Sequence, residues 1–235
     1  MMRILAFGIH PDDIELGCGG TVALLAVERH EVVLVDLSDG ASASNGTVET
    51  RAKEARTAAK ILGAAKRINL GFADTALQSE NLDQQRSVVA CIRENRPDFV
   101  LLPLKDDPHP DHAAGGELVE RALYLSGVHG YEAGGDAWRP KNALIYPGRR
   151  ELAPDLIIDI TRTHETKVRA IEAHDSQFGR GKNRLPTPLN SEDFLRSVEG
   201  RARLYGSRIG VRFGEPLRLL NPLAVTTMSQ LLAGR

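Results

Sequence analysis

Two short clusters of histidine and aspartate contain the side chains in this 235-residue chain that are best suited to chemistry, His10-Pro11-Asp12-Asp13 and His109-Pro110-Asp111-His112. Imidazole nitrogens and carboxylate oxygens bind zinc in hydrolytic sites, where three protein ligands leave one coordination position open. A further carboxylate beside such an ion can take a proton from an attacking water molecule. Together the two clusters predict a metal-dependent hydrolase.

Two histidines and one carboxylate form the expected metal site. We expect His10, Asp13 and His112 to bind the ion. Pro11 stiffens the first turn, so that His10 and Asp13 can face one ion across three positions. This ligand set suits Zn²⁺, and Fe²⁺ or another divalent metal ion is the alternative because such ions use the same ligand types.

The other polar side chains of the two clusters are assigned to catalysis. Asp12 is the expected general base, because a carboxylate beside a divalent ion stays ionised. His109, as an imidazolium, would stabilise a tetrahedral oxyanion and protonate a leaving amine, while Asp111 would hold its tautomer. The structural alternative is that these aspartates only cap the helices that follow, since aspartate is a favoured N-cap residue.

Short apolar runs alternate with helix-like segments in the first half of the chain, which is typical of a parallel sheet covered by helices on both faces. Strands are predicted over residues 3–9, 31–37, 67–70 and 98–102, and helices over residues 19–29, 47–62, 82–95 and 113–124. The two clusters, Ser38-Asp39 and Asp74 each follow one of these strands. Because the carboxyl ends of parallel strands meet at one edge, we expect these side chains to lie together.

The second half of the chain is less regular. Strands are predicted over residues 144–146 and 156–159, helices over 161–174 and 192–205, and loops over 127–140 and 179–188, the second loop being basic. No internal repeat or linker divides the sequence. Residues 1–235 are therefore expected to form a single α/β domain with a mostly parallel sheet.

Composition restricts the classes of partner. The formal net charge of -1 gives no reason to expect nucleic acid or an anionic membrane as a partner. Two cysteines, Cys18 and Cys91, suit a reducing compartment, and Cys18 is expected to be a small packed residue. The apolar run at the N-terminus is too short for a secretory signal, and no run approaches the roughly 20 apolar residues of a membrane span. We expect a cytoplasmic protein with a small-molecule substrate.

The two clusters occur in a wider pattern that resembles the LmbE-like or PIG-L family of zinc-dependent N-acetylglucosaminyl deacetylases. The resemblance runs nearly end to end, and its most specific parts are residues 10–15, 17–21 and 109–112. Less specific residues resemble the branch that acts on N-acetylglucosaminyl-malate in bacillithiol biosynthesis: residues 44–47, 51, 54–55, 61–63, 67, 176–178, 187–189 and 210–211.

The resemblance implies the same ligand set and the same roles for Asp12 and His109. It also implies a Rossmann-like fold, a zinc cofactor and homo-oligomers, frequently hexamers. The chain departs from the bacillithiol branch at Pro108, where relatives often carry arginine, and at Phe194, where they often carry tyrosine. These departures bear on the identity of the substrate rather than on catalysis.

A malate-bearing sugar carries two carboxylates, so its pocket needs a cation. Arg51 is the best candidate, because a guanidinium can bind a carboxylate in a bidentate fork. The alternative is that Arg51 lies on a solvated helix face. Glu15 and Asp39 are expected to accept hydrogen bonds from sugar hydroxyls. The basic loop offers further cations, Arg180, Lys182 and Arg184.

Other functions fit the residues less well. The alternative substrates within the same reaction are another N-acetylglucosamine conjugate or a chitooligosaccharide. A metal-assisted phosphoesterase is disfavoured because only one metal site is evident and no phosphate-binding glycine loop occurs. A non-catalytic sugar- or nucleotide-binding module would need neither Asp12 nor His109. His174 is expected to be a core or surface histidine.

Overall fold

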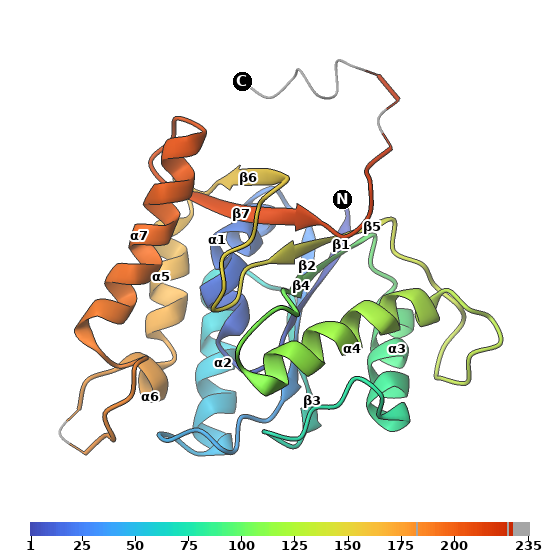
Figure 1. Cartoon of the computed structure of the whole chain (residues 1–235), viewed down its shortest axis with the longest axis horizontal. Coiled ribbons are helices and arrows are strands. Elements are labelled where there is room, and N and C mark those ends of the chain that lie inside the picture. Colours follow the sequence, from blue (N-terminus) through green and yellow to red (C-terminus); the bar gives the residue numbers. More distant parts are fainter. Residues whose placement is uncertain (182, 225, 228–235) are drawn as a thin grey trace.

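A computed structural model of the chain describes residues 1–181, 183–224 and 226–227 (Figure 1). In this part of the chain, seven strands form one sheet in the order β3-β2-β1-β4-β5-β7-β6. The strands are β1 (Arg3–Gly8), β2 (Glu31–Ser38), β3 (Lys66–Phe72), β4 (Phe99–Pro103), β5 (Asn142–Tyr146), β6 (Leu156–Asp159) and β7 (Gly214–Leu219). The pairs from β3 to β5 are parallel, whereas β7 runs antiparallel to β5 and β6.

Helices cover both faces of the sheet (Figure 1). They are α1 (Asp13–Val27), α2 (Val48–Leu62), α3 (Leu82–Asn95), α4 (Pro110–Ser126), α5 (His164–Glu172), α6 (Asp175–Phe178) and α7 (Glu192–Arg208). Leu5 and Phe7 of β1 pack into a core with α3 and α4, and Ile4 and Ala6 pack into a second core with α1, α2 and α5. Side chains alternate between the two faces along a strand, so a central strand that is apolar at every position supplies both cores.

The structure confirms the expected single α/β domain with a mostly parallel sheet flanked by helices. The helix predicted over residues 161–174 is confirmed as the shorter α5, and the short α6, which was not predicted, follows it. Strand β7 was not predicted, because Pro216 and Glu215 are poor strand formers. Pairing with β5 and β6 stabilises it nonetheless.

Helix α1 begins at Asp13, earlier than the predicted start at Gly19, and its regular geometry is interrupted at Cys18. Its glycines disfavour a helix in isolation but permit close packing. A Cβ atom on Gly17 would lie 2.2 Å from the Tyr146 ring, and one on Gly20 would lie 2.8 Å from Ile160. The same glycines that disfavour a helix prediction before Gly19 therefore allow α1 to pack close to the sheet.

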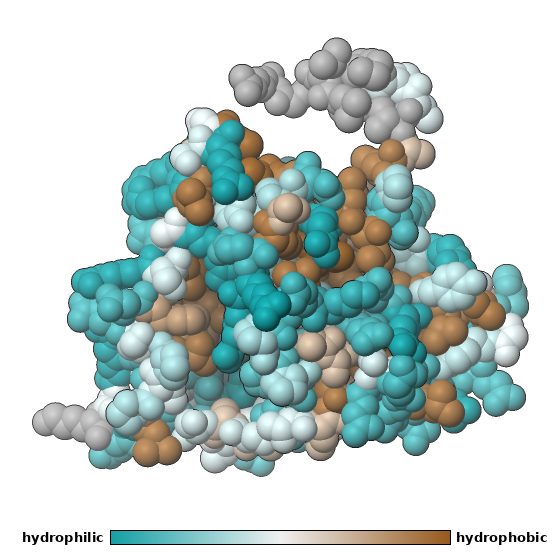
Figure 2. All heavy atoms as spheres, viewed as in Figure 1, coloured by the Kyte–Doolittle hydropathy of each residue, from teal (hydrophilic) through white to brown (hydrophobic). Residues whose placement is uncertain are grey.

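Hydrophilic residues cover most of the face shown in Figure 2, with apolar residues scattered between them. Among the described residues, none of the helices combines the length and the apolar character that crossing a membrane requires.

Candidate metal and catalytic site

The two histidine and aspartate clusters meet because the strands before them are neighbours. β1 and β4 pair in parallel, and each is followed at its carboxyl end by one cluster. Asp13 is the first residue of α1, and His112 lies in the first turn of α4. The two chain segments therefore present their side chains at the same edge of the sheet.

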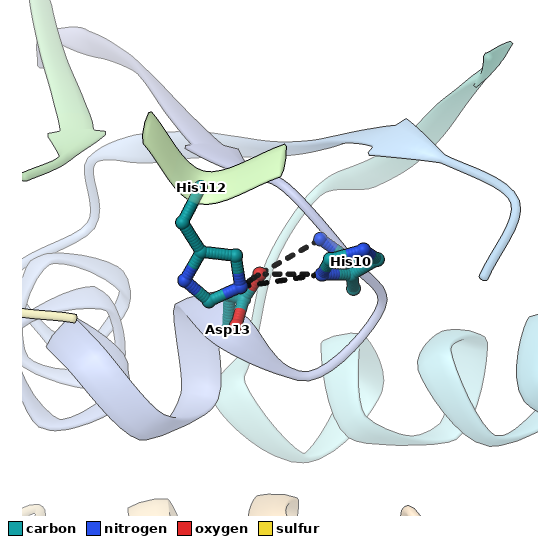
Figure 3. A group of neighbouring side chains, drawn as sticks. All are labelled: His10, Asp13 and His112. Carbon is teal, nitrogen blue, oxygen red and sulfur yellow. Dashed lines mark hydrogen bonds and ion pairs between the residues drawn. The ribbon is translucent and has the colours of Figure 1, made fainter. Parts of the chain in front are cut away.

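Three candidate ligand atoms, from His10, Asp13 and His112, form a nearly equilateral triangle (Figure 3). His10 Nδ1 lies 3.3 Å from His112 Nε2 and 3.5 Å from Asp13 Oδ2, and His112 Nε2 lies 3.4 Å from Asp13 Oδ2. A tetrahedral zinc ion with bonds of about 2.0–2.1 Å separates neighbouring ligand atoms by about 3.3–3.4 Å. The donor types and their spacing fit such an ion.

In both candidate histidine ligands, the ring nitrogen that does not belong to the triangle contacts a carboxylate. His10 Nε2 lies 3.0 Å from Asp74 Oδ1, and His112 Nδ1 lies 3.5 Å from Asp107 Oδ1. Outer carboxylates of this kind fix the orientation and tautomer of metal-binding histidines. Asp111 also approaches His10 Nε2, at 3.7 Å. Asp107 was not among the site residues predicted from the sequence, although it lies just before the second cluster.

The carboxylates also favour positive charge at the centre of the site. Burial opposes the charged form of His10, but hydrogen bonds to Asp13 and Asp74 raise its pKa to about 10. Burial likewise opposes the charged form of His112, and Asp13 and Asp107 raise its pKa above the ordinary value. An environment that stabilises imidazolium ions also stabilises a bound metal cation.

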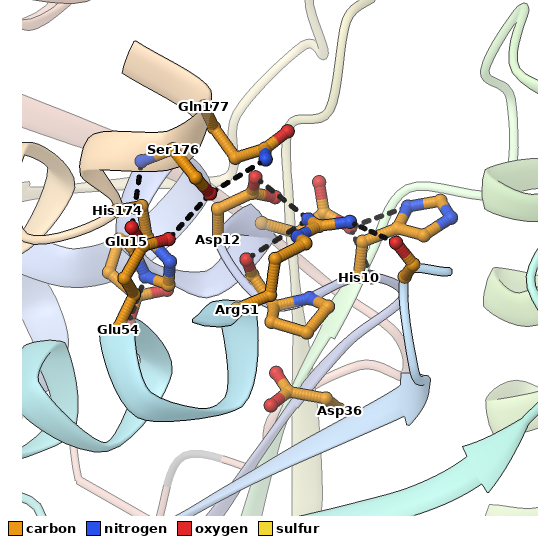
Figure 4. A network of polar contacts seen from close by, with 12 residues as sticks. His10, Asp12, Glu15, Asp36, Arg51, Glu54, His174, Ser176 and Gln177 are labelled. Atoms are coloured by element: carbon orange, nitrogen blue, oxygen red, sulfur yellow. Dashed lines mark hydrogen bonds and ion pairs between the residues drawn. The ribbon is translucent and has the colours of Figure 1, made fainter. Parts of the chain in front are cut away.

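Asp12 is not one of the three candidate ligands, and its carboxylate pairs with Arg51 (Figure 4). Its backbone has a φ of 155°, which residues other than glycine rarely adopt. Asp12 Oδ2 lies 3.2 Å from Arg51 Nη2. Burial raises the pKa of Asp12, and Arg51 opposes that shift. Asp12 is thus a buried carboxylate, separate from the metal ligands, beside the candidate metal centre.

Arg51 is buried, with 4% of its surface exposed, so the alternative of a solvated helix face is wrong. Besides Asp12, its guanidinium donates hydrogen bonds to the carbonyl oxygens of Gly40, at 2.9 Å, and Pro11, at 3.3 Å. The observed role of Arg51 is to hold the Asp12 turn. Because Arg51 also lines the cavity, contact with a substrate stays a prediction.

His109 caps the start of α4. Its Nδ1 accepts a hydrogen bond from the backbone N–H of Asp111 at 3.2 Å, which leaves Nε2 to carry the proton of the neutral ring. Burial, with His112 and His10 nearby, lowers the pKa of His109. The structure therefore favours a neutral hydrogen-bond donor over the imidazolium that we expected.

Asp111 has different partners from those expected. Its carboxylate accepts hydrogen bonds from the backbone N–H groups of Thr75, at 2.7 Å, and Leu77, at 3.4 Å. It therefore holds the loop after β3 rather than the ring of His109. The alternative role as a helix cap is also wrong, because His109 occupies that position.

Glu15 and Asp39 do not line the cavity, contrary to their expected role as substrate-binding residues. The Glu15 side chain is fully buried and forms an ion pair with Arg67, which also binds Asp36. Asp39 Oδ1 accepts a hydrogen bond from the backbone N–H of Ala41 at 2.9 Å, which is ordinary turn chemistry. His174 is a core histidine, as expected, with its Nε2 3.4 Å from Glu15.

The basic loop, residues 179–188, does not supply the cations that were expected for the substrate. Arg184 pairs with Asp175, neither Arg180 nor Arg184 lines the cavity, and Lys182 lies outside the described residues. The cations that do line it besides Arg51 are Arg149 and Arg201. Arg149 could have been found from its position just after the predicted strand 144–146. Arg201 lies on a helix and gives no such signal. Cys18 is a packed residue, as expected.

The metal ligands, Asp12, Arg51 and His109 open into one cavity of about 720 Å³. This volume is within the range of about 300–1,000 Å³ that is usual for small-molecule sites. Its lining combines the metal ligands, Asp12 and His109 with the less polar side chains of Pro186, Leu189 and Phe194. A two-histidine, one-carboxylate centre with a separate buried carboxylate is typical of metal-dependent hydrolases.

Comparison with known proteins identifies the family. The family model described as GlcNAc-PI de-N-acetylase, PIG-L, matches residues 5–123. The diacetylchitobiose deacetylase of Thermococcus kodakarensis is 31% identical over 233 residues, covering 93% of this chain and 83% of that protein. The chain therefore belongs to the PIG-L family of de-N-acetylases.

Solved structures support the same assignment. A conserved protein of Thermus thermophilus has a TM-score of 0.87 at 32% identity, covering 96% of this chain and 98% of that chain. The N,N'-diacetylchitobiose deacetylase of Pyrococcus horikoshii has a TM-score of 0.81 at 27% identity, covering 93% and 84%. A further relative is known by its sequence similarity. This probable N-acetyl-α-D-glucosaminyl L-malate deacetylase 2 of Bacillus cereus is 29% identical over 191 residues, covering 74% of this chain and 83% of that protein.

Proposed function

We propose that this protein is a zinc-dependent deacetylase that removes the acetyl group from a chitooligosaccharide of the diacetylchitobiose type. The observation that carries the proposal is the triangle of His10, Asp13 and His112 beside buried Asp12 in one cavity. The sequence favoured N-acetylglucosaminyl-malate as the substrate, with a chitooligosaccharide as the alternative. Similarity to two diacetylchitobiose deacetylases supports the alternative better.

The reaction is hydrolysis of an acetamide: water adds to the carbonyl carbon, the C–N bond breaks, and acetate and a free amine are released. His10, Asp13 and His112 would hold zinc, which would supply polarisation of the carbonyl group and a more acidic water. Asp12 takes the proton of the attacking water. Arg51 favours the ionised form of Asp12 and holds its carboxylate in place through the 3.2 Å contact.

His109 acts on the developing negative charge. In its neutral form the Nε2–H group is free to donate to the tetrahedral oxyanion, since Nδ1 is held by the backbone of Asp111. A neutral imidazole is a poor acid, so the proton for the leaving amine comes from protonated Asp12. Burial, which raises the pKa of Asp12, suits this carboxyl to carrying a proton between water and amine.

A second substrate class has one observation in its favour. Arg149 and Arg201 line the cavity, and guanidinium groups bind carboxylates such as those of malate. The Arg201 side chain already donates a hydrogen bond to the Gly148 carbonyl oxygen at 3.0 Å. An N-acetylglucosaminyl-malate substrate would use these two cations rather than the basic loop.

The test is acetate release by zinc-loaded protein from N,N'-diacetylchitobiose, N-acetylglucosamine and N-acetylglucosaminyl-malate. We expect the highest kcat/KM with diacetylchitobiose, loss of turnover after chelation, and recovery when zinc is restored. Preference for the malate conjugate would keep the mechanism and change the substrate. Absence of acetate release from all three compounds, despite bound zinc, would contradict the proposal.

A further inference from the structure

Asn45 joins two segments that lie far apart in the sequence. Its Nδ2 donates a hydrogen bond to the carbonyl oxygen of Leu185 at 3.0 Å, and the backbone N–H of Leu185 donates to Asn45 Oδ1 at 2.9 Å. This pair of bonds is the pattern that a neighbouring strand would offer. Gln177 Nε2 donates to the backbone carbonyl oxygen of Asn45 at 2.7 Å, which fixes the asparagine itself.

The segment that Asn45 holds forms one wall of the cavity. Residues 186–189 all line the cavity, and Phe194 at the start of α7 continues the same wall. Asn190 supports the segment from its other end, because its Nδ2 donates to Leu185 O at 3.0 Å and its Oδ1 accepts from Thr187 N at 2.9 Å. Two prolines further restrict the backbone. The wall is thus held in a defined shape.

The wall is uncharged and, apart from Thr187, apolar. The Phe194 ring stacks on Phe178, with ring centroids 5.6 Å apart and an interplanar angle of 11°. Leu189 packs with them in one hydrophobic cluster. A pyranose ring has apolar C–H faces and polar edges, so a rigid aromatic and aliphatic surface suits one face of such a ring.

The segment that carries Asn45 contributes a second, more polar wall. Ser42 and Ser44 line the same cavity and carry hydroxyl groups that can donate and accept hydrogen bonds. The backbone N–H of Ser42 is held by Asp74 Oδ2 at 2.8 Å. One asparagine therefore connects a wall that suits sugar hydroxyls to a wall that suits a sugar face.

We propose that residues 186–189 and Phe194 form a subsite for a second pyranose ring, joined to the sugar that loses its acetyl group. Asn45 is a positioning residue that holds this subsite through Leu185. This inference rests on the proposed deacetylase function, and it assigns the substrate preference to particular residues. A single N-acetylglucosamine would occupy only the part of the cavity beside the metal ligands.

The experiment compares two substrates in the same full-length, zinc-loaded protein, with kcat and KM measured separately for N,N'-diacetylchitobiose and N-acetylglucosamine. We expect Phe194→Ala and Asn45→Ala each to lower the preference for the disaccharide, expressed as the ratio of the two kcat/KM values, about tenfold. The change should lie in the KM for the disaccharide. A general loss of folded protein lowers both kcat/KM values together and leaves their ratio unchanged.

Matched controls separate the subsite from its surroundings. Leu204→Ala removes an exposed apolar side chain from the same helix as Phe194, and Asn183→Ala removes an exposed amide from the same loop as Leu185. Neither Leu204 nor Asn183 lines the cavity. Both control variants should keep the wild-type ratio.

Each remaining outcome has one meaning. An active wild-type enzyme whose ratio is unchanged in both Phe194→Ala and Asn45→Ala overturns the subsite and leaves the deacetylase function standing. A wild-type protein that binds zinc but releases acetate from neither sugar and not from the malate conjugate overturns the proposed function itself. If only Arg149→Ala lowers activity, and only with the malate conjugate, the cavity binds an anionic group and the sugar subsite is wrong.

Discussion

The candidate metal site depends on the residues behind its histidine ligands as well as on the ligands themselves. His10 and His112 each direct one ring nitrogen to the triangle of ligand atoms and the other to a carboxylate. Asp107 is itself held by the backbone N–H groups of His109, at 2.9 Å, and Arg149, at 2.7 Å. This outer contact should raise metal affinity, because it fixes the tautomer and orientation of His112.

We therefore expect Asp107→Ala to weaken zinc binding about 10- to 100-fold. Titration against a competing chelator measures this affinity directly. Asp106→Ala is the matched control, since Asp106 is exposed and pairs only with Arg150 among the described residues. Equal zinc affinity in the wild type and in both variants would show that Asp107 does not support His112.

Asp12 should be needed for turnover but not for metal. We expect Asp12→Asn to lower kcat about 10²- to 10⁴-fold, because an amide cannot accept the proton of water. Metal analysis should show that the variant keeps its zinc. Asp39→Asn is the control, because Asp39 also follows a central strand but does not line the cavity. Unchanged kcat in Asp12→Asn would refute the assignment of the base.

At the scale of elements, helix α1 depends on a residue from the far end of the chain. Beyond the break at Cys18, the backbone N–H groups of Gly20 and Thr21 donate to the Glu215 carboxylate of β7, at 2.9 and 2.7 Å. Lys167 Nζ of α5 donates to the same carboxylate at 2.6 Å. Glu215 thus caps the second part of α1 and joins it to the sheet.

Replacing Glu215 should be costly. We expect Glu215→Ala to lower the free energy of unfolding by about 3–5 kcal/mol, because Lys167 would be left buried and without its counter-charge. Denaturant titration of the metal-free protein measures this change. Glu199→Ala, which removes an exposed partner of Arg203, should change the same quantity by less than about 0.5 kcal/mol. Similar losses in both variants would contradict the role of Glu215.

At the scale of the whole molecule, a buried cluster of charges joins three elements. Arg67 of β3 pairs with Glu15 of α1 and with Asp36 of β2, at 2.7 Å in the second case. Burial opposes the charged form of Glu15, but Arg67 and His174 lower its pKa to about 2. Because this pKa is lower in the folded protein than in the unfolded chain, protonation of Glu15 favours unfolding.

The stability contributed by Glu15 is therefore present above pH about 4.5 and is lost as the pH falls towards about 2. We expect the free energy of unfolding of the metal-free wild type to fall more steeply across this interval than that of Glu15→Gln. Denaturant titrations at several pH values measure both slopes. Parallel slopes would mean that Glu15 does not contribute to acid sensitivity.

The homo-oligomer that the family resemblance implies stays a prediction for this protein. Sedimentation equilibrium of the zinc-loaded protein measures the mass directly. A mass equal to that of the 25.6 kDa chain over the whole concentration range would contradict the prediction.

Local patterns in the sequence predict the fold class, the pairing of the two clusters and the candidate metal ligands. These features follow from local patterns and from one topological rule. Apolar runs define the strands, and parallel strands place the residues that follow them at one edge. His10, Asp13 and His112 could be predicted as ligands because each belongs to a short local motif that directly follows a predicted strand or precedes a predicted helix.

The pairing of charged residues, in contrast, follows from the three-dimensional arrangement of the chain. Glu15 was expected in the substrate pocket but is buried against Arg67. Asp107, which was not predicted, contacts the second ring nitrogen of His112. Arg51 proved to hold Asp12. Each choice depends on partners that folding brings together from distant parts of the chain, and local residue patterns do not encode such distances. Strand β7 shows the same principle, because pairing with β5 and β6 outweighs its weak intrinsic preference for a strand.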